Sequence, residues 1–143
     1  MRTLIIIRGP SGAGKTTLAK RLLEGNFGHF FEADQFFMID GQYSFDASRL
    51  GQAHKDCQLR VRKAMEKTSD PLVVSNTNMT RWELNPYLQM AVEYNYTVKV
   101  YRIKGPWDAK LFAARNLHGL SEANIQRQID KYQPLENEEE YAG

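Results

Sequence analysis

Short apolar runs alternate with amphipathic stretches along the chain, and each pattern predicts one kind of element. Residues 4–8 include three consecutive isoleucines, which is typical of a strand buried on both faces of a parallel sheet. Further short runs predict strands over residues 29–33, 72–75 and 96–103. Helical spacing of apolar residues predicts helices over residues 15–24, 47–67, 108–116 and 121–132, and a helix that Thr80 and Glu83 cap.

Strands that alternate with helices imply right-handed crossovers and a parallel sheet. The predicted fold class is therefore α/β, with helices on both faces of one sheet. The 143 residues are enough for one domain with its own core. Residues 34–44 are mostly turn-like, and Asp40 and Gly41 predict a turn within them.

The composition indicates the class of protein and its expected location. Hydrophobic residues make up 42% and charged residues 25%, as in ordinary soluble proteins. No apolar run approaches the roughly 20 residues that cross a bilayer, and the N-terminal residues do not resemble a signal peptide. The single cysteine, Cys57, excludes an internal disulfide and fits a reducing compartment. We therefore expect no membrane contact and a cytoplasmic location, in a bacterium or in a phage-infected cell.

The charge is unevenly distributed. The whole chain carries a net charge of +2, but the tail from Glu136 onward contains four glutamates and no basic residue, so residues 1–135 carry +6. A moderately basic body suits an anionic ligand. The acidic tail is expected to be a solvated or frayed end.

Residues 9–16 read GPSGAGKT and match the phosphate-binding loop G-x-x-x-x-G-K-[ST]. Glycines let consecutive N–H groups converge on one anion, and the positive end of the following helix points to the same place. Lys15 adds a full charge near the outer phosphates, and the Thr16 hydroxyl can ligate the Mg²⁺ ion of the nucleotide. The expected nucleotide-binding residues are Gly9, Ser11, Gly12, Ala13, Gly14, Lys15, Thr16 and Thr17. The alternative, a plain glycine turn, is disfavoured because the motif lies between a predicted strand and a predicted helix.

The loop alone does not distinguish a kinase from a hydrolase switch or a motor. Switches and motors place an aspartate at the end of a second apolar strand, where this chain has Ser75 and Asn76. A carboxylate does follow the predicted strand 29–33, at Asp34. A kinase needs such a base to accept the proton of the acceptor hydroxyl. The alternative for Asp34 is a helix cap or a surface turn.

Four further segments resemble one family: EADQFF (32–37), DGQYSFDASRLGQAH (40–54), VVSNTNMTRWELNPY (73–87) and RNLHGL (115–120). Together with the loop they are similar to the kinase domain of the Nedd-four-binding protein two type, a relative of phage and animal polynucleotide kinases. The resemblance covers about residues 3–134. It implies a three-layer P-loop NTPase fold over residues 1–135, with the predicted strands in the nucleoside-kinase order 2-3-1-4. It also implies a helical lid at about residues 105–132, followed by the acidic tail, residues 136–143.

The resemblance further implies transfer of phosphate from ATP, or GTP, with Mg²⁺, to the 5′-hydroxyl of DNA or RNA. In that picture Lys15 and Thr16 bind the triphosphate and its Mg²⁺, and Asp34 is the general base. Arg115 reaches from the lid over the phosphates, while Asn76 and Asn78 line the acceptor side.

Other residues near these motifs are weaker candidates. Arg81 could contact an acceptor phosphate, and Trp82 could stack on a base, as could Phe36 or Phe37, although aromatic residues are more often core. His54 and Cys57 are expected to pack in the core. No metal cluster is expected beyond the Mg²⁺ of the nucleotide.

Three positions depart from the family pattern. Gln35, Ser75 and Phe37 stand where the family often has acidic residues or, in the phage enzymes, an arginine. These departures leave the acceptor open. Two rivals to a polynucleotide kinase therefore remain: a kinase for a nucleoside, nucleotide or sugar, and a nucleotide-dependent binding module with slow hydrolysis.

Overall fold

The computed structural model describes residues 2–24, 28–116 and 119–143. Within them a parallel five-stranded sheet has the order β2-β5-β1-β6-β7. Its strands are β1 (Thr3–Arg8), β2 (His29–Phe31), β5 (Leu72–Ser75), β6 (Thr97–Ile103) and β7 (Glu138–Tyr141). The helices are α1 (Lys15–Leu23), α2 (Leu50–Lys67), α3 (Arg81–Glu93), α4 (Ala109–Ala114) and α5 (Glu122–Asp130).

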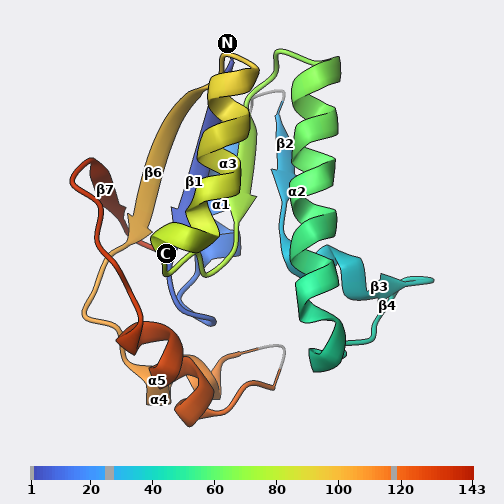
Figure 1. Ribbon diagram of the computed structural model, residues 1–143. Coiled ribbons are helices and arrows are strands. Elements are labelled where there is room, and N and C mark those ends of the chain that lie inside the picture. The colour runs from blue at the N-terminus through green and yellow to red at the C-terminus, as the bar shows by residue number, and fades with distance from the viewer. Residues whose placement is uncertain (1, 25–27, 117–118) are drawn as a thin grey trace.

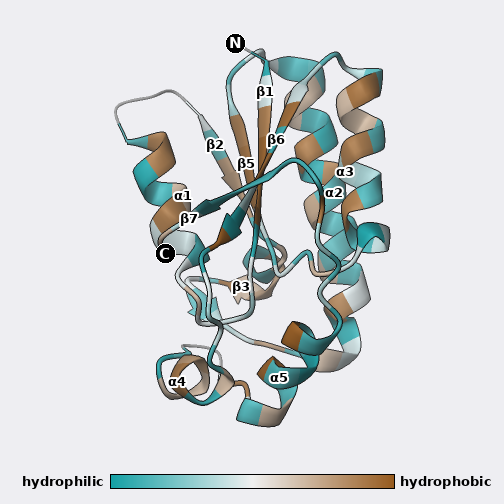
Figure 2. Cartoon of the chain, turned by 90° about the vertical axis from the view of Figure 1, so that its left-hand side faces the viewer, coloured by the Kyte–Doolittle hydropathy of each residue, from teal (hydrophilic) through white to brown (hydrophobic). Residues whose placement is uncertain are grey.

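The sheet lies between two helical layers (Figures 1 and 2). Helix α1 covers one face, and α2 and α3 cover the other. Helices α4 and α5 lie beyond the C-terminal edge of the strands, where a lid was expected. The α/β fold class is confirmed, and the four predicted strands stand in the predicted order.

Alternation along the strands divides the core between the two faces. Leu4 and Ile6 of β1 pack with α2 and α3 residues in one cluster. Ile7 packs on the other face with Leu18 and Ala19 of α1. The prediction of a strand buried on both faces is therefore confirmed for β1.

The acidic tail is a correction to the sequence analysis. Residues Glu138–Tyr141 form β7, which pairs in parallel with β6, and the N–H of Lys104 donates to the carbonyl of Tyr141. Glu138 pairs with Arg8 at 2.7 Å and Glu140 with Arg102 at 2.8 Å. Because basic side chains of the neighbouring strands compensate the glutamates, this part of the tail joins the sheet and is not a frayed end.

The turn-rich segment after β2 has a definite shape. It begins with a short 3-10 helix, η1 (Ala33–Phe37), and continues as a hairpin of β3 (Met38–Ile39) and β4 (Gln42–Tyr43). Asp40 and Gly41 have positive φ angles at the tip, as the predicted turn requires. A second 3-10 turn, η2 (Ala47–Arg49), leads into α2. This arrangement places residues 32–50 beside the C-terminal edge of the sheet.

Two remaining predictions concern the cysteine and the membrane. Cys57 is a buried free thiol in α2, so its predicted core position is confirmed. In the parts of the chain that the structure describes, no helix is both long and apolar enough to cross a membrane. The predicted helix end at Gly25 and Asn26 lies outside the described residues, as does His118.

Candidate active site

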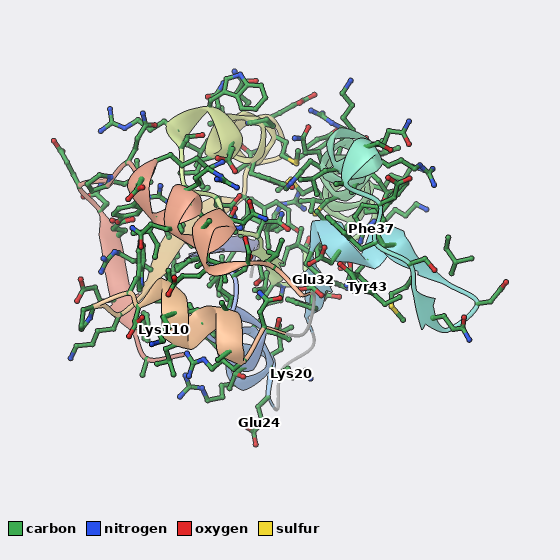
Figure 3. The ribbon with its side chains drawn as sticks, turned by 90° about the horizontal axis from the view of Figure 1, so that it is seen from below. Lys20, Glu24, Glu32, Phe37, Tyr43 and Lys110 are labelled. Carbon is green, nitrogen blue, oxygen red and sulfur yellow. The ribbon has the colours of Figure 1, made fainter. Side chains whose placement is uncertain are left out.

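A cleft of about 470 Å³ lies at the C-terminal edge of the sheet. One wall comes from the loop between β1 and α1, and the opposite wall comes from η1, β4 and the start of α2. Residues of the α4–α5 segment line a third side. In the view from below, Glu32 and Tyr43 lie near each other, and Lys110 of α4 lies on the opposite side of the molecule (Figure 3).

The phosphate loop has the backbone that its glycines predict. Gly12 and Gly14 have φ angles of 83° and 100°, which other residues rarely adopt. A Cβ on Gly12 would lie 2.5 Å from the carbonyl oxygen of Phe112 in α4, so the lid segment packs directly on the loop. The predicted loop residues Ser11, Gly12, Gly14, Lys15, Thr16 and Thr17 line the cleft. Gly9 and Ala13 do not line it; the N–H of Gly9 donates to Thr77 and Ala13 is buried, so both hold the shape of the loop.

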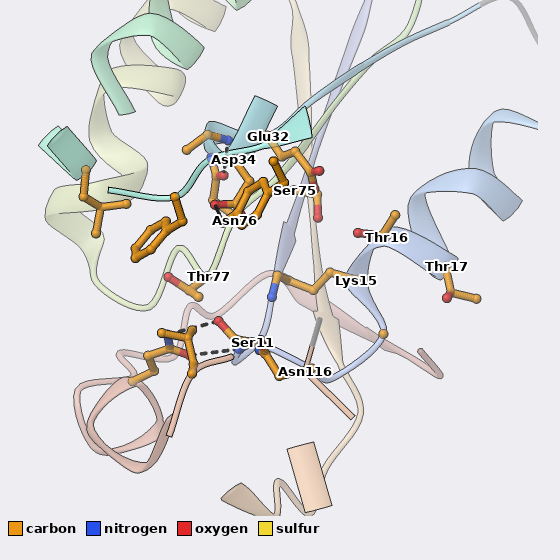
Figure 4. A pocket seen from close by; sticks show the side chains of 18 of the residues that line it. Ser11, Lys15, Thr16, Thr17, Glu32, Asp34, Ser75, Asn76, Thr77 and Asn116 are labelled. Atoms are coloured by element: carbon orange, nitrogen blue, oxygen red, sulfur yellow. Dashed lines mark hydrogen bonds between the residues drawn. The ribbon is translucent and has the colours of Figure 1, made fainter. Parts of the chain in front are cut away.

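Lys15 extends from the loop into the cleft (Figure 4). Its Nζ donates to the carbonyl of Pro10 at 3.0 Å. Burial lowers the pKa of Lys15 to about 8, although the carboxylates of Glu32 and Asp34 act in the opposite direction. A phosphate bound beside Lys15 would raise this pKa again and keep the side chain fully protonated.

Three oxygen-bearing side chains near Lys15 fit a nucleotide-bound Mg²⁺. The hydroxyl of Thr16 and the carboxylate of Glu32 are directed toward the same part of the cleft (Figure 4). The buried hydroxyl of Ser75, a residue that also lines the cleft, has no hydrogen-bond partner among the described residues. Oxygen donors are the ligands that Mg²⁺ prefers. Within the described ranges no three His, Cys, Asp or Glu side chains form a metal cluster, so the ion would depend on nucleotide oxygens as well.

Glu32 was not among the site residues predicted from the sequence. The available signal was its position two residues before Asp34, because both residues follow the same strand and can face the same edge of the sheet.

Asp34 lies in the first turn of η1 and faces the cleft. The side chain of Asn76 accepts a hydrogen bond of 2.8 Å from the N–H of Ala33, which holds the backbone next to Asp34. The Tyr43 hydroxyl donates to the Asp34 carboxylate at 3.3 Å. Burial, and then the charge of Asp34, raise the pKa of Tyr43, so its hydroxyl keeps the proton that it donates. Asp34 and Asn76 are therefore brought together, as predicted, and Tyr43 joins them.

Among the described residues of the α4–α5 segment, Arg115 and Gln128 form side-chain hydrogen bonds to the loop. The guanidinium of Arg115, at the C-terminal end of α4, donates to the carbonyl of Gly12 at 2.8 Å. Gln128 of α5 accepts from the N–H of Ser11 at 2.8 Å and donates to its hydroxyl at 3.1 Å (Figure 4). Arg115 lies at the phosphate loop as predicted. No sequence pattern marked Gln128, because its partner is 117 residues away.

Other predicted acceptor residues do not line the cleft. The amide of Asn78 is buried and donates to the carbonyl of Ile7 at 3.2 Å. The Arg81 side chain donates to the carbonyl of Pro134, and Trp82 is 85% exposed. The prediction for His54 was also wrong. His54 was expected in the core, but it is half-buried and lines the cleft.

A buried arginine lies at the end of the strand that leads into the phosphate loop. Arg8, at the end of β1, is fully buried and donates to the carbonyls of Asn78, Met79 and Gln133 at 2.7–2.9 Å. Its fourth partner is the carboxylate of Glu138. Burial lowers the pKa of Arg8, and the hydrogen bond and charge of Glu138 counteract this effect. This network joins the strand before the phosphate loop to the segments that follow β5 and α5.

Comparisons with known proteins agree with this geometry. A protein-family model described as an AAA domain matches residues 4–135. Human NEDD4-binding protein 2 is 39% identical over 134 residues, which cover 91% of this chain and 8% of that protein. Rat 2′,3′-cyclic-nucleotide 3′-phosphodiesterase is 30% identical over 74% of this chain and 25% of its own length. The chain therefore spans less than a third of the length of either relative.

Solved structures share the fold at low sequence identity. A chain of the Pnkp1/Rnl/Hen1 RNA repair complex has a TM-score of 0.71 at 15% identity, over 90% of this chain and 43% of its own length. A gluconokinase from Sinorhizobium meliloti has a TM-score of 0.67 at 15% identity, over 99% of this chain and 82% of its own length. These likenesses establish a P-loop kinase-like fold.

Proposed function

Because the chain belongs to the AAA domain family, whose P-loop kinase-like fold it has, we propose that it transfers the γ-phosphate of ATP to a hydroxyl group, the 5′-hydroxyl of a polynucleotide. One observation carries the proposal: Asp34 faces the same cleft as Lys15 and the phosphate loop. A protein that only binds a nucleotide has no need of a base opposite the phosphates.

In the proposed reaction, the acceptor oxygen forms a bond to the γ-phosphorus and the bond to the bridging oxygen of ADP breaks. Asp34 accepts the proton of the acceptor hydroxyl. Lys15, Arg115 and the N–H groups of the loop bind the phosphates and stabilise the charge that develops on them. The α4–α5 segment acts as the lid that keeps water from the phosphates.

Mg²⁺ would be held by Thr16 and Glu32 together with the phosphates, and when bound it neutralises phosphate charge. Glu32 thus supplies a carboxylate on the phosphate side although the end of β5 has only Ser75. The two acidic residues of the cleft therefore have different proposed roles. Glu32 helps to hold Mg²⁺, and Asp34 accepts the proton of the acceptor hydroxyl.

Two observations support a polynucleotide over a small acceptor. The chain that resembles this one with a TM-score of 0.71 belongs to an RNA repair complex. Two aromatic side chains, Tyr43 and Phe45, also line the acceptor wall of the cleft. A small-molecule kinase remains the second candidate, because a gluconokinase shares the fold over nearly the whole chain.

A transfer assay tests the proposal. The protein is incubated with γ-labelled ATP, Mg²⁺ and a panel of oligonucleotides with free 5′-hydroxyls, nucleosides, nucleoside monophosphates and sugars. Label on the oligonucleotides is the expected result. Label only on a small molecule would identify the second candidate. Release of free phosphate at a rate independent of every acceptor would instead support a binding module with slow hydrolysis.

A further inference from the structure

We propose that Tyr43, Phe45, Leu50 and His54 form an aromatic wall that binds the base of the nucleotide carrying the acceptor hydroxyl. The inference rests on the proposed kinase function and specifies its acceptor as a nucleobase-bearing molecule. All four side chains line the cleft that contains Asp34. None of them was assigned a substrate role from the sequence.

The wall begins at the catalytic carboxylate. Tyr43 donates to Asp34 at 3.3 Å, and the other three residues continue along the same side of the cleft through the loop after β4 and the start of α2. An acceptor whose hydroxyl reaches Asp34 therefore extends across these side chains. In a nucleotide, the base is the flat part that lies a few ångströms from the 5′-hydroxyl.

The two aromatic rings have nearly the same orientation. Their centroids lie 6.3 Å apart and their planes differ by 14°. Phe37, which is buried, holds both from behind through edge contacts with centroid distances of 6.3 Å to Tyr43 and 5.1 Å to Phe45. A flat heterocycle placed against one ring is thus nearly parallel to the other, which is the arrangement that base stacking needs. Phe45 is 40% exposed, so its ring is accessible.

The wall is uncharged. Burial lowers the pKa of His54, although Glu83 and Asp34 oppose this effect, so its imidazole is neutral at pH 7. Leu50 is apolar, and the Tyr43 hydroxyl already donates to Asp34. A polyhydroxylated sugar needs several convergent hydrogen-bonding groups, and a phosphate needs cations. The wall offers neither, whereas a neutral heterocycle finds an apolar surface with one imidazole as a polar partner.

The aromatic residues considered from the sequence are unsuited to this role. Phe37 is inside the core, and the Arg49 guanidinium lies over the ring of Phe36 at 4.7 Å. Trp82 does not line the cleft. The proposed stacking surface is therefore formed by Tyr43 and Phe45 and not by the aromatic residues considered from the sequence.

The test compares two oligonucleotides with free 5′-hydroxyls that differ only in whether the first nucleotide carries a base or is abasic. With wild-type protein, we expect the abasic acceptor to have a roughly 10-fold higher KM. Phe45→Ala should raise the KM of the base-bearing acceptor by a similar factor and leave the abasic one unchanged, and Phe45→Trp should restore the preference. Met38→Ala is the matched control, since Met38 is an exposed apolar residue of the β3–β4 hairpin, close in sequence to Phe45, and does not line the cleft.

Several results would overturn the inference. Equal KM values for the two acceptors in the wild type, or an equal rise for both in Phe45→Ala, would show that the base is not recognised by the wall. A rise in the KM for ATP alone would place the donor's adenine there. If phosphate is transferred to sugars alone, the protein is a kinase, but the proposed base recognition is wrong. If no acceptor is phosphorylated, the proposed function fails. The inference can then still be tested by fluorescence anisotropy, which measures whether the protein binds the base-bearing oligonucleotide more tightly than the abasic one.

Discussion

The two halves of the cleft are built in different ways. The phosphate half is built mainly on one contiguous segment, residues 9–17, whose backbone is shaped by Gly12 and Gly14, and Glu32 and Arg115 add side chains to it. The acceptor half combines η1, the β3–β4 hairpin and the start of α2, and its surface is made of side chains. A contiguous backbone site recognises a group common to all nucleotides. A site assembled from separate elements can change its acceptor through single substitutions.

The largest effect should come from the carboxylate that makes the two halves work together. Asp34→Asn keeps the shape but cannot accept a proton, so transfer should fall by roughly 10³-fold while ADP affinity changes less than about twofold. Transfer rates and calorimetric ADP binding measure the two quantities. Asp40→Asn, at the exposed tip of the hairpin, is the control and should leave both unchanged. Transfer that survives in Asp34→Asn would show that another group is the base.

Removing the buried arginine at the end of β1 should mainly affect stability. Arg8→Met leaves the Glu138 carboxylate, only 8% exposed, without its cationic partner, and should lower the free energy of unfolding by about 3–5 kcal/mol. Chemical denaturation measures the change. Arg62→Met removes a surface arginine paired with Glu93 and should have little effect. Equal losses in the two variants would mean that burial of the Arg8 network contributes nothing.

The phosphate half should respond to pH through Lys15. Above its pKa of about 8, the free protein holds Lys15 neutral and must take up a proton to bind phosphate through a charged lysine. ADP affinity should therefore fall roughly fivefold between pH 8 and pH 9, and much less between pH 6 and pH 7. Lys15→Arg stays protonated throughout, so its affinity should be flat above pH 7. A fall of the same size in that variant would assign the titration to another group.

The assignment of Glu32 to the phosphate half can be separated from catalysis. If its carboxylate helps to hold Mg²⁺, Glu32→Gln should reduce the strengthening of ADP binding by Mg²⁺ roughly fivefold. Calorimetry with and without Mg²⁺ measures this strengthening. Glu136→Gln, an exposed glutamate beyond α5, is the control. An unchanged Mg²⁺ effect in Glu32→Gln would place Glu32 outside the ion's surroundings.

The smallest effect should come from the lid contact. Gln128→Ala removes both hydrogen bonds to Ser11, and ADP affinity should weaken roughly threefold. Gln126→Ala, on the exposed side of the same helix, should not weaken it. Identical affinities for the two variants would mean that the lid and the loop are not coupled through Gln128.

Prediction from the sequence succeeded where the signal was local and failed where the partner was distant. Asp34 was identified because it directly follows a strand, and Arg115 because of a resemblance in its own segment. The resemblance placed Asn78 on the acceptor side, and Trp82 was a weaker candidate for stacking on a base, but the backbone turns after β5 and carries both out of the cleft. The tail was read from its charge alone, and the basic partners of its glutamates lie on β1 and β6.

The sequence by itself determined four strands of the sheet, the phosphate loop and the edge at which the site lies. Apolar periodicity and glycine backbone freedom act over a few residues, so a single segment is sufficient to reveal them. Only the tertiary structure decided that Glu32 faces Thr16, that Gln128 holds Ser11, and that Tyr43 and Phe45 form one wall beside Asp34. Those relations depend on the packing of elements far apart in the chain, and packing is settled by the shape and burial of all the contacting side chains together.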